Sequence, residues 1–207
     1  MKKAWEIRLL LSWLLVITLA APLTAGLPHR MVHNYFDIVK MLKQRARQRT
    51  ITPFIQAFFP PHDRVQELVC GLIQEETERI EVEAFQLTNR AIAESLLEAH
   101  YRGVDIRLIV DVGALGRFSK VLQLYNAGIP VFVYPQDGIG GYSLMHNKIM
   151  LLYSLSCIIT GSMNFTNAGL DKNRENLVVI QHEELFEEYA YQFKALCKNT
   201  TPLGQAL

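Results

Sequence analysis

Between residues 55 and 197 the sequence alternates short apolar runs with segments of helical periodicity, and this alternation restricts the possible folds more than any other feature. Strand-like runs lie at residues 55–59, 79–87, 105–111, 129–134, 146–153, 157–161 and 175–181. Helical patterns lie at residues 65–76, 91–97, 119–126 and 183–197. Since short βαβ connections usually produce parallel strands, we expect an α/β fold. It should have a mostly parallel mixed sheet, covered by helices on both faces, in one domain over residues 51–207.

The first 25 residues have the three-part order of a secretory signal peptide. Residues 1–8 are short and basic, residues 9–23 are almost wholly apolar, and small residues follow at 24–26. The apolar run of 15 residues is shorter than the about 20 that comfortably span a bilayer. We therefore expect an exported protein, periplasmic or secreted after cleavage near Ala25. Alternatively, residues 9–23 remain uncleaved and anchor the protein to a membrane.

Charge is distributed unevenly behind this segment. Residues 26–50 carry six basic residues against Asp37, whereas residues 51–207 carry 12 basic and 18 acidic residues. Apolar residues recur at helical spacing in the basic stretch, at Met31, Tyr35, Ile38 and Leu42. We interpret residues 26–50 as a basic linker helix. The alternative is an amphipathic surface element that meets anionic lipid or nucleic acid.

Composition and cysteine usage exclude several other classes of protein. With 50% apolar and 20% charged residues, the chain is not a disordered tail, a collagen-like fibre or a coiled coil. Its three cysteines, Cys70, Cys157 and Cys197, lie far apart and form no CxxC pair. This pattern argues against a disulfide scaffold and against a structural zinc site.

Polar clusters stand at the ends of three neighbouring predicted strands, where open α/β sheets bind ligands. They comprise His146 and Lys148, then Gly161, Ser162 and Asn164, then residues 173–176 with Glu175. An imidazole can attack phosphorus or transfer a proton near neutral pH. A lysine, an amide and a hydroxyl can hold phosphoryl oxygens, and a carboxylate can fix the imidazole tautomer. These residue types suit phosphoryl chemistry, and the sequence has no cluster of metal ligands to do that work instead.

The order HxK, GSxN and NxEN resembles the phospholipase D superfamily. It is most similar to the small single-motif members, namely bacterial nonspecific endonucleases and the mitochondrial cardiolipin-hydrolase group. The likeness extends through most of residues 52–198, including AFQLTNRAIAESLLEAHYRGVDIRLIVD, NAGIPV and MHNK. It implies a phosphodiesterase without cofactor or metal, in which His146 forms a covalent phosphohistidine. It also implies that Lys148, Ser162 and Asn164 bind phosphate and that Glu175 orients the histidine.

The chain departs from the family pattern at two places. Tyr153 stands where the family motif HxKxxxxD has its aspartate, and the gap to GSxN is one residue longer. A hairpin loop at residues 154–156 could absorb the extra length. Tyr153 lies at the far end of the predicted strand from His146, so we expect a competent site. The alternative is a degenerate, non-catalytic phosphate-binding module.

A single HxK leaves the family mechanism one histidine short. That mechanism uses one histidine as nucleophile and a second as the acid that protonates the leaving oxygen. The remaining histidines lack a lysine at the same spacing and are interpreted as surface or packing residues: His29, His33, His62, His100 and His182. We therefore expect a homodimer, in which a two-fold contact brings two copies of the motif into one composite site.

The sequence favours nucleic acid over phospholipid as substrate. Four basic residues, Arg117, Lys120, Lys172 and Arg174, lie in segments expected near His146 and could track phosphates in a groove. The net acidic body weighs against this interpretation. The alternative is a phospholipase D or cardiolipin hydrolase, for which Ile139, Tyr142 and Leu144 could form an apolar rim.

Overall fold

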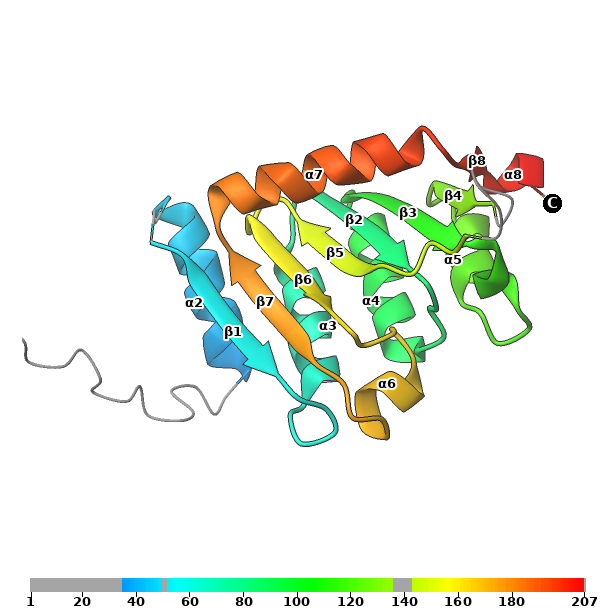
Figure 1. Ribbon diagram of the computed structural model, residues 1–207. Coiled ribbons are helices and arrows are strands. Elements are labelled where there is room, and N and C mark those ends of the chain that lie inside the picture. The colour runs from blue at the N-terminus through cyan, green and yellow to red at the C-terminus, as the bar shows by residue number, and fades with distance from the viewer. Residues whose placement is uncertain (1–34, 50–51, 136–142, 207) are drawn as a thin grey trace, which may run out of the picture. The chain divides into compact units, whose positions relative to one another are not determined.

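The computed structural model of the protein describes residues 35–49, 52–135 and 143–206 (Figure 1). The expected signal or anchor segment at residues 1–25 lies outside these ranges. None of the helices in the described part of the chain is long and apolar enough to span a membrane. The described part of the expected linker forms α2 (Tyr35–Arg47), which buries Ile38, Val39 and Leu42. It packs against α3 (Val65–Glu75) and so belongs to the folded domain, not to a solvated connection.

One eight-stranded sheet organises the domain, in the order β1-β7-β6-β5-β2-β3-β4-β8. The strands in that order are Phe54–Phe58, Leu177–Gln181, Cys157–Gly161, Lys148–Leu152, Arg79–Ala84, Asp105–Asp111, Val131–Tyr134 and Thr201–Pro202. The α/β class and the mixed sheet are confirmed, but the expected majority of parallel pairs is wrong. Among the strand pairs of the described residues, β2–β3 and β3–β4 are parallel, and the other five pairs are antiparallel.

Connection length explains this difference. Parallel neighbours need a crossover, and α4 (Arg90–Tyr101) and α5 (Val121–Asn126) supply one for each parallel pair. The helices begin and end where local signals require it. The side chain of Asn89 accepts a hydrogen bond from Ile92 N and caps α4, and Gly103 adopts a positive φ of 93° after its end. Between β5 and β6 there is only a tight turn, which permits antiparallel pairing alone.

Helices cover both faces of the sheet, as expected. Figure 1 shows α7 (Glu183–Cys197) lying across one face, with α2, α3, α4 and α5 behind the other. Phe186, Ala190 and Phe193 of α7 pack onto Ile109, Leu151 and Ile158 of the sheet. Because side chains alternate along a strand, Leu108, Val110, Met150 and Ile159 point to the opposite layer.

Strand directions bring one set of strand ends together. The carboxyl ends of β6, β2 and β3 lie at the same end of the sheet as the amino ends of β5 and β7. We call this the motif end, defined by Gly161, Ala84, Asp111, Lys148 and Leu177. Two short helices also lie at this end. The helix η1 (Val112–Leu115) directly follows β3, and α6 (Asn167–Asp171) lies in the connection from β6 to β7.

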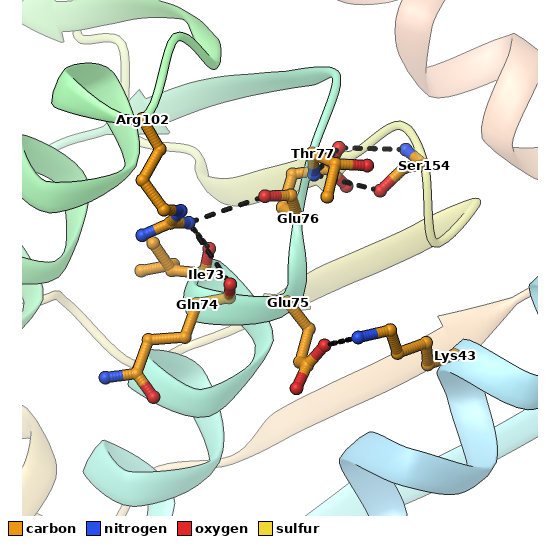
Figure 2. A network of polar contacts seen from close by, with 8 residues as sticks. All are labelled: Lys43, Ile73, Gln74, Glu75, Glu76, Thr77, Arg102 and Ser154. Carbon is orange, nitrogen blue, oxygen red and sulfur yellow. Dashed lines mark hydrogen bonds and ion pairs between the residues drawn. The ribbon is translucent and has the colours of Figure 1, made fainter.

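A buried carboxylate secures the opposite end of the sheet (Figure 2). Glu76 is fully buried, and its Oε1 accepts hydrogen bonds from the backbone of Thr77, Glu78 and Ser154 at 2.7–3.0 Å. Arg102 closes the end of α3 by donating to the carbonyl of Ile73 at 3.0 Å. These bonds connect the turn after β5 to the start of β2, which keeps both strands in register.

Candidate active site

All five predicted motif residues lie at the motif end of the sheet. Lys148 is the first residue of β5, and His146 precedes the strand instead of lying on it as expected. Ser162 and Asn164 follow β6, and Glu175 precedes β7. Because β5, β6 and β7 are consecutive neighbours in the sheet, their ends form one site.

His146 and Lys148 contact each other directly. Lys148 Nζ lies 3.1 Å from His146 Nδ1 and also donates to the carbonyl oxygen of His146. Lys148 is only 6% exposed, whereas His146 is exposed to solvent. Burial lowers the pKa of Lys148, and the nearby carboxylate of Glu175 opposes that shift. A protonated Lys148 uses the lone pair on Nδ1, so in this arrangement the imidazole carries its proton on Nε2.

Phe85 supports this pair and was missed by the sequence reasoning. Its ring centroid lies 4.4 Å from that of His146, and Lys148 Nζ lies 4.9 Å from the same ring. Phe85 follows β2, whose last residue, Ala84, pairs with Lys148. The ring gives the site one apolar wall, which limits the orientations open to the imidazole and partly desolvates the ammonium.

The carboxylate of Glu175 is held by hydrogen bonds from Ser162 and Asn173. Its Oε2 accepts a 2.5 Å hydrogen bond from Ser162 Oγ, and its Oε1 accepts one of 3.1 Å from Asn173. Within the described ranges it makes no hydrogen bond to His146, although its charge acts on Lys148. Asn176 completes the connection by donating its backbone N–H to Ser162 Oγ and accepting from Ser162 N at 2.9 Å.

Asn164 carries a buried polar atom that lacks a partner. Three buried side-chain atoms in the described part of the chain have no hydrogen bond, and they are Glu76 Oε2, Glu81 Oε1 and Asn164 Oδ1. Only Asn164 belongs to the motif. The two ends of an amide are assigned from their partners, so this position can present either a donor or an acceptor to a ligand.

A family model described as cardiolipin synthase, PLD-like domain, matches residues 69–197, which is more than half of the chain. The chain belongs to the phospholipase D superfamily. An imidazole, an ammonium and an amide gathered at one end of the sheet agree with this membership.

Individual relatives extend this comparison. A protein named phospholipase D from Rickettsia conorii is 32% identical over 136 residues, which are 65% of this chain and 65% of that protein. The chain therefore spans slightly less than two thirds of that relative. A mitochondrial cardiolipin hydrolase from Xenopus tropicalis is 29% identical, over 59% of this chain and 56% of its own. The crystal structure of Nuc, a phospholipase D family member from Salmonella typhimurium, superposes with a TM-score of 0.65 at 28% identity, covering 73% of this chain and 98% of Nuc.

The departure from the superfamily motif at Tyr153 is accommodated away from the site. Tyr153 directly follows β5 at the end opposite His146, and its hydroxyl donates to Glu81 Oε2 at 2.7 Å. Its ring meets Phe186 of α7 edge-on at 5.0 Å and lies under the guanidinium of Arg79 at 5.1 Å. Tyr153 thus connects the sheet to α7, and its position gives it no contact with the motif.

The four basic residues expected to line a groove form two separate groups at the motif end. Arg117 is exposed. Lys120 directly precedes α5, and its backbone N–H donates to Leu87 O at 2.9 Å. Lys172 and Arg174 are exposed on the other side, between α6 and Glu175. Arg174 donates to His62 Nε2 at 2.8 Å, which brings that histidine to the same end of the sheet.

Two further expectations concern the surroundings of the site. Of the suggested apolar rim, Leu144 is 39% exposed, and Ile139 and Tyr142 lie outside the described residues. In the described ranges, no group of three or more His, Cys, Asp or Glu side chains could hold a metal ion.

Proposed function

We propose that this protein hydrolyses phosphodiester bonds of nucleic acid through a phosphohistidine formed on His146, without a metal ion. One observation carries the proposal: an exposed imidazole lies 3.1 Å from a buried lysine ammonium. That pair supplies a nucleophile and a fixed positive charge for the phosphate that it attacks. The neighbouring amide of Asn164, which has no partner in the described structure, supports a phosphate site at the same place.

The contact between Lys148 and His146 suggests how substrate prepares the nucleophile. In the free enzyme the ammonium of Lys148 donates to Nδ1 of His146, so the proton of the neutral imidazole is on Nε2. When a non-bridging phosphate oxygen accepts from Lys148, Nδ1 becomes free to carry the proton and Nε2 gains the lone pair that attacks phosphorus. Glu175, whose charge already acts on Lys148, is the carboxylate available to accept from Nδ1–H.

The chemical steps then balance as follows. Nε2 forms a bond to phosphorus while the bond to the leaving oxygen breaks, and a second imidazolium protonates that oxygen. The second imidazole, now neutral, takes a proton from water. The resulting hydroxide attacks phosphorus, and the P–N bond to His146 breaks. The products are an alcohol and a phosphomonoester, and both histidines return to their starting states.

We propose that the second imidazole is His146 of another copy of the chain. In the described residues, His182 caps α7 at the opposite end of the sheet, and His100 bonds to Ala127 O at 3.1 Å. His62 lies at the motif end, but Arg174 donates to its Nε2, so that atom holds no proton to give. A homodimer with one composite site therefore remains our proposal.

Nucleic acid is the proposed substrate because the basic residues form two groups on either side of the motif. Arg117 and Lys120 lie beyond β3, and Lys172 and Arg174 lie before β7, so a phosphate chain crossing the site could contact both groups. The second candidate is a phospholipid. The relatives named phospholipase D and mitochondrial cardiolipin hydrolase favour it, as does exposed Leu144 beside His146.

We also propose that residues 1–25 direct export or anchor the chain to a membrane.

Three labelled substrates separate these functions when each is offered to the purified full chain in excess EDTA. We expect cleavage of single-stranded DNA or RNA, unchanged by the chelator, and little hydrolysis of cardiolipin in vesicles. His146→Asn should abolish turnover. The matched control is His182→Asn, since asparagine can also cap α7, and it should retain full activity. Restoration of a chelator-inhibited reaction by magnesium would reject the mechanism, and hydrolysis of cardiolipin alone would select the second candidate.

A further inference from the structure

A groove lies at the motif end of the sheet, formed by segments next in the chain to residues of the site. Its volume is about 430 Å³, and the loops after β2, β3 and β6 line it. Gln86 in its wall directly follows Phe85, whose ring contacts His146, and Thr166 lies two residues after Asn164. Backbone bonds from Thr88 N and Asn89 N to Phe165 O, both 3.0 Å, join the two walls. Two walls of the groove are thus built by segments that also carry Phe85 and Asn164 of the site.

The third wall offers an aromatic ring to solvent. Phe118 is 68% exposed, although an aromatic side chain is usually buried. The guanidinium carbon of Arg117 lies 4.4 Å from the centre of its ring, so one side of the ring is already stacked. This cation–π contact limits the motion of a side chain that otherwise lies free on the surface. A ring kept in place beside a phosphate site suits stacking of a planar group.

On the opposite wall of the groove, two hydrogen bonds of Asn89 fix the orientation of the Asn167 amide. The Oδ1 of Asn89 accepts from Ile92 N, so its Nδ2 must be the atom that donates to Asn167 Oδ1 at 2.7 Å. The amide of Asn167, which lines the groove, is thereby oriented. Its Nδ2 remains as a donor for a carbonyl oxygen, such as those of thymine, uracil, cytosine or guanine.

From these observations we infer that the groove binds the nucleobase adjacent to the scissile phosphate, with Phe118 as its stacking surface and Asn167 as a donor to its edge. The inference rests on the proposed nucleic-acid function and deepens it. An acyl chain fits less well because the apolar side chains in the lining are only Ala114, Phe118 and Ala168, and the remainder is glycine or polar. Stacking without a full set of base contacts would give binding with little sequence preference.

A comparison of substrates with and without a base tests the inference. The substrates are a thymidine dinucleotide with one phosphodiester and two analogues, each with one thymine replaced by an abasic tetrahydrofuran. Phe118→Ala should lower kcat/KM on the dinucleotide by about 5- to 150-fold, as expected for loss of one stacked base. On one of the two analogues it should change kcat/KM by less than about twofold, because that substrate has no base to stack.

Matched variants identify the ring as the cause. Phe118→Tyr should retain the activity that Phe118→Leu loses, since leucine has similar apolar bulk but no ring. Tyr191→Ala removes an aromatic side chain that is 75% exposed on α7, outside the groove, and should have no effect. Equal losses on all three substrates, or no loss on any, would overturn the inference while the nucleic-acid function stands. Failure of the wild type to cleave the dinucleotide would reject that function, and the inference with it.

Discussion

Replacing Glu83 by glutamine should change how the stability of the protein depends on pH. Glu83 lies on β2 with only 1% of its surface exposed, and it accepts a 2.7 Å hydrogen bond from Asn147, the residue between His146 and Lys148. Burial raises the pKa of Glu83 from its ordinary 4.5 to about 7. The bond from Asn147 opposes this shift, and the charge of Glu81 adds to it. Glutamine keeps an acceptor for Asn147 and cannot ionise.

The sign follows from comparing proton binding in the two states. Below pH 4.5 the side chain of Glu83 is protonated in both the folded and the unfolded chain. Between pH 4.5 and about 7 the unfolded chain loses this proton while the folded chain keeps it, so the wild type loses stability as pH rises. The loss is about 1.4 kcal/mol per pH unit, or roughly 3 kcal/mol across the window, and it ends once both states are ionised.

Urea unfolding at pH 4.5, 5.5, 6.5 and 8 measures this effect. The free energy of unfolding of Glu83→Gln, minus that of wild type, should rise by roughly 3 kcal/mol over the series and then level off. Glu188→Gln on the exposed face of α7 is the control and should show no such rise. A difference between Glu83→Gln and wild type that is constant with pH would refute the reasoning, because Glu83 would then ionise alike in both states.

Three further predictions test the site and its supports. Gly161→Ala should lower the free energy of unfolding by about 1–3 kcal/mol and impair activity, because an added Cβ would lie 2.3 Å from Asn176 O. Gly116→Ala, with nothing within 4 Å, is its control in urea titrations, and equal effects would contradict the steric argument. Tyr153→Phe should cost about 1–3 kcal/mol by removing the bond to buried Glu81, yet kcat should stay within about twofold. Loss of kcat would mean that Tyr153 supports the site. Finally, mixing His146→Asn with wild-type chains under subunit exchange should reduce activity with the square of the wild-type fraction, whereas a linear decrease would reject a composite site.

The local elements and the residue types of the site could be predicted from sequence. The helix expected at residues 183–197 agrees with α7 at both ends, and Asn89 and Gly103 bound α4 as their chemistry predicts. Helical periodicity and capping depend on residues within about one turn, so the neighbouring sequence specifies them. The order of His146, Lys148 and the later polar clusters, at the ends of predicted strands, likewise indicated phosphoryl chemistry.

Strand pairing was decided only by the tertiary structure. β2 pairs antiparallel with β5, so that Glu83 faces Ile149, a residue far along the chain, and no local pattern encodes that partner. The pairing brings Phe85 against His146 and gives Asn147 a buried carboxyl partner. Contacts of this kind depend on the packing of distant segments, in which loop closure and burial of the whole sheet outweigh local preference. The sequence alone therefore indicated which groups are candidates for the reaction, and the sheet determined what surrounds and orients them.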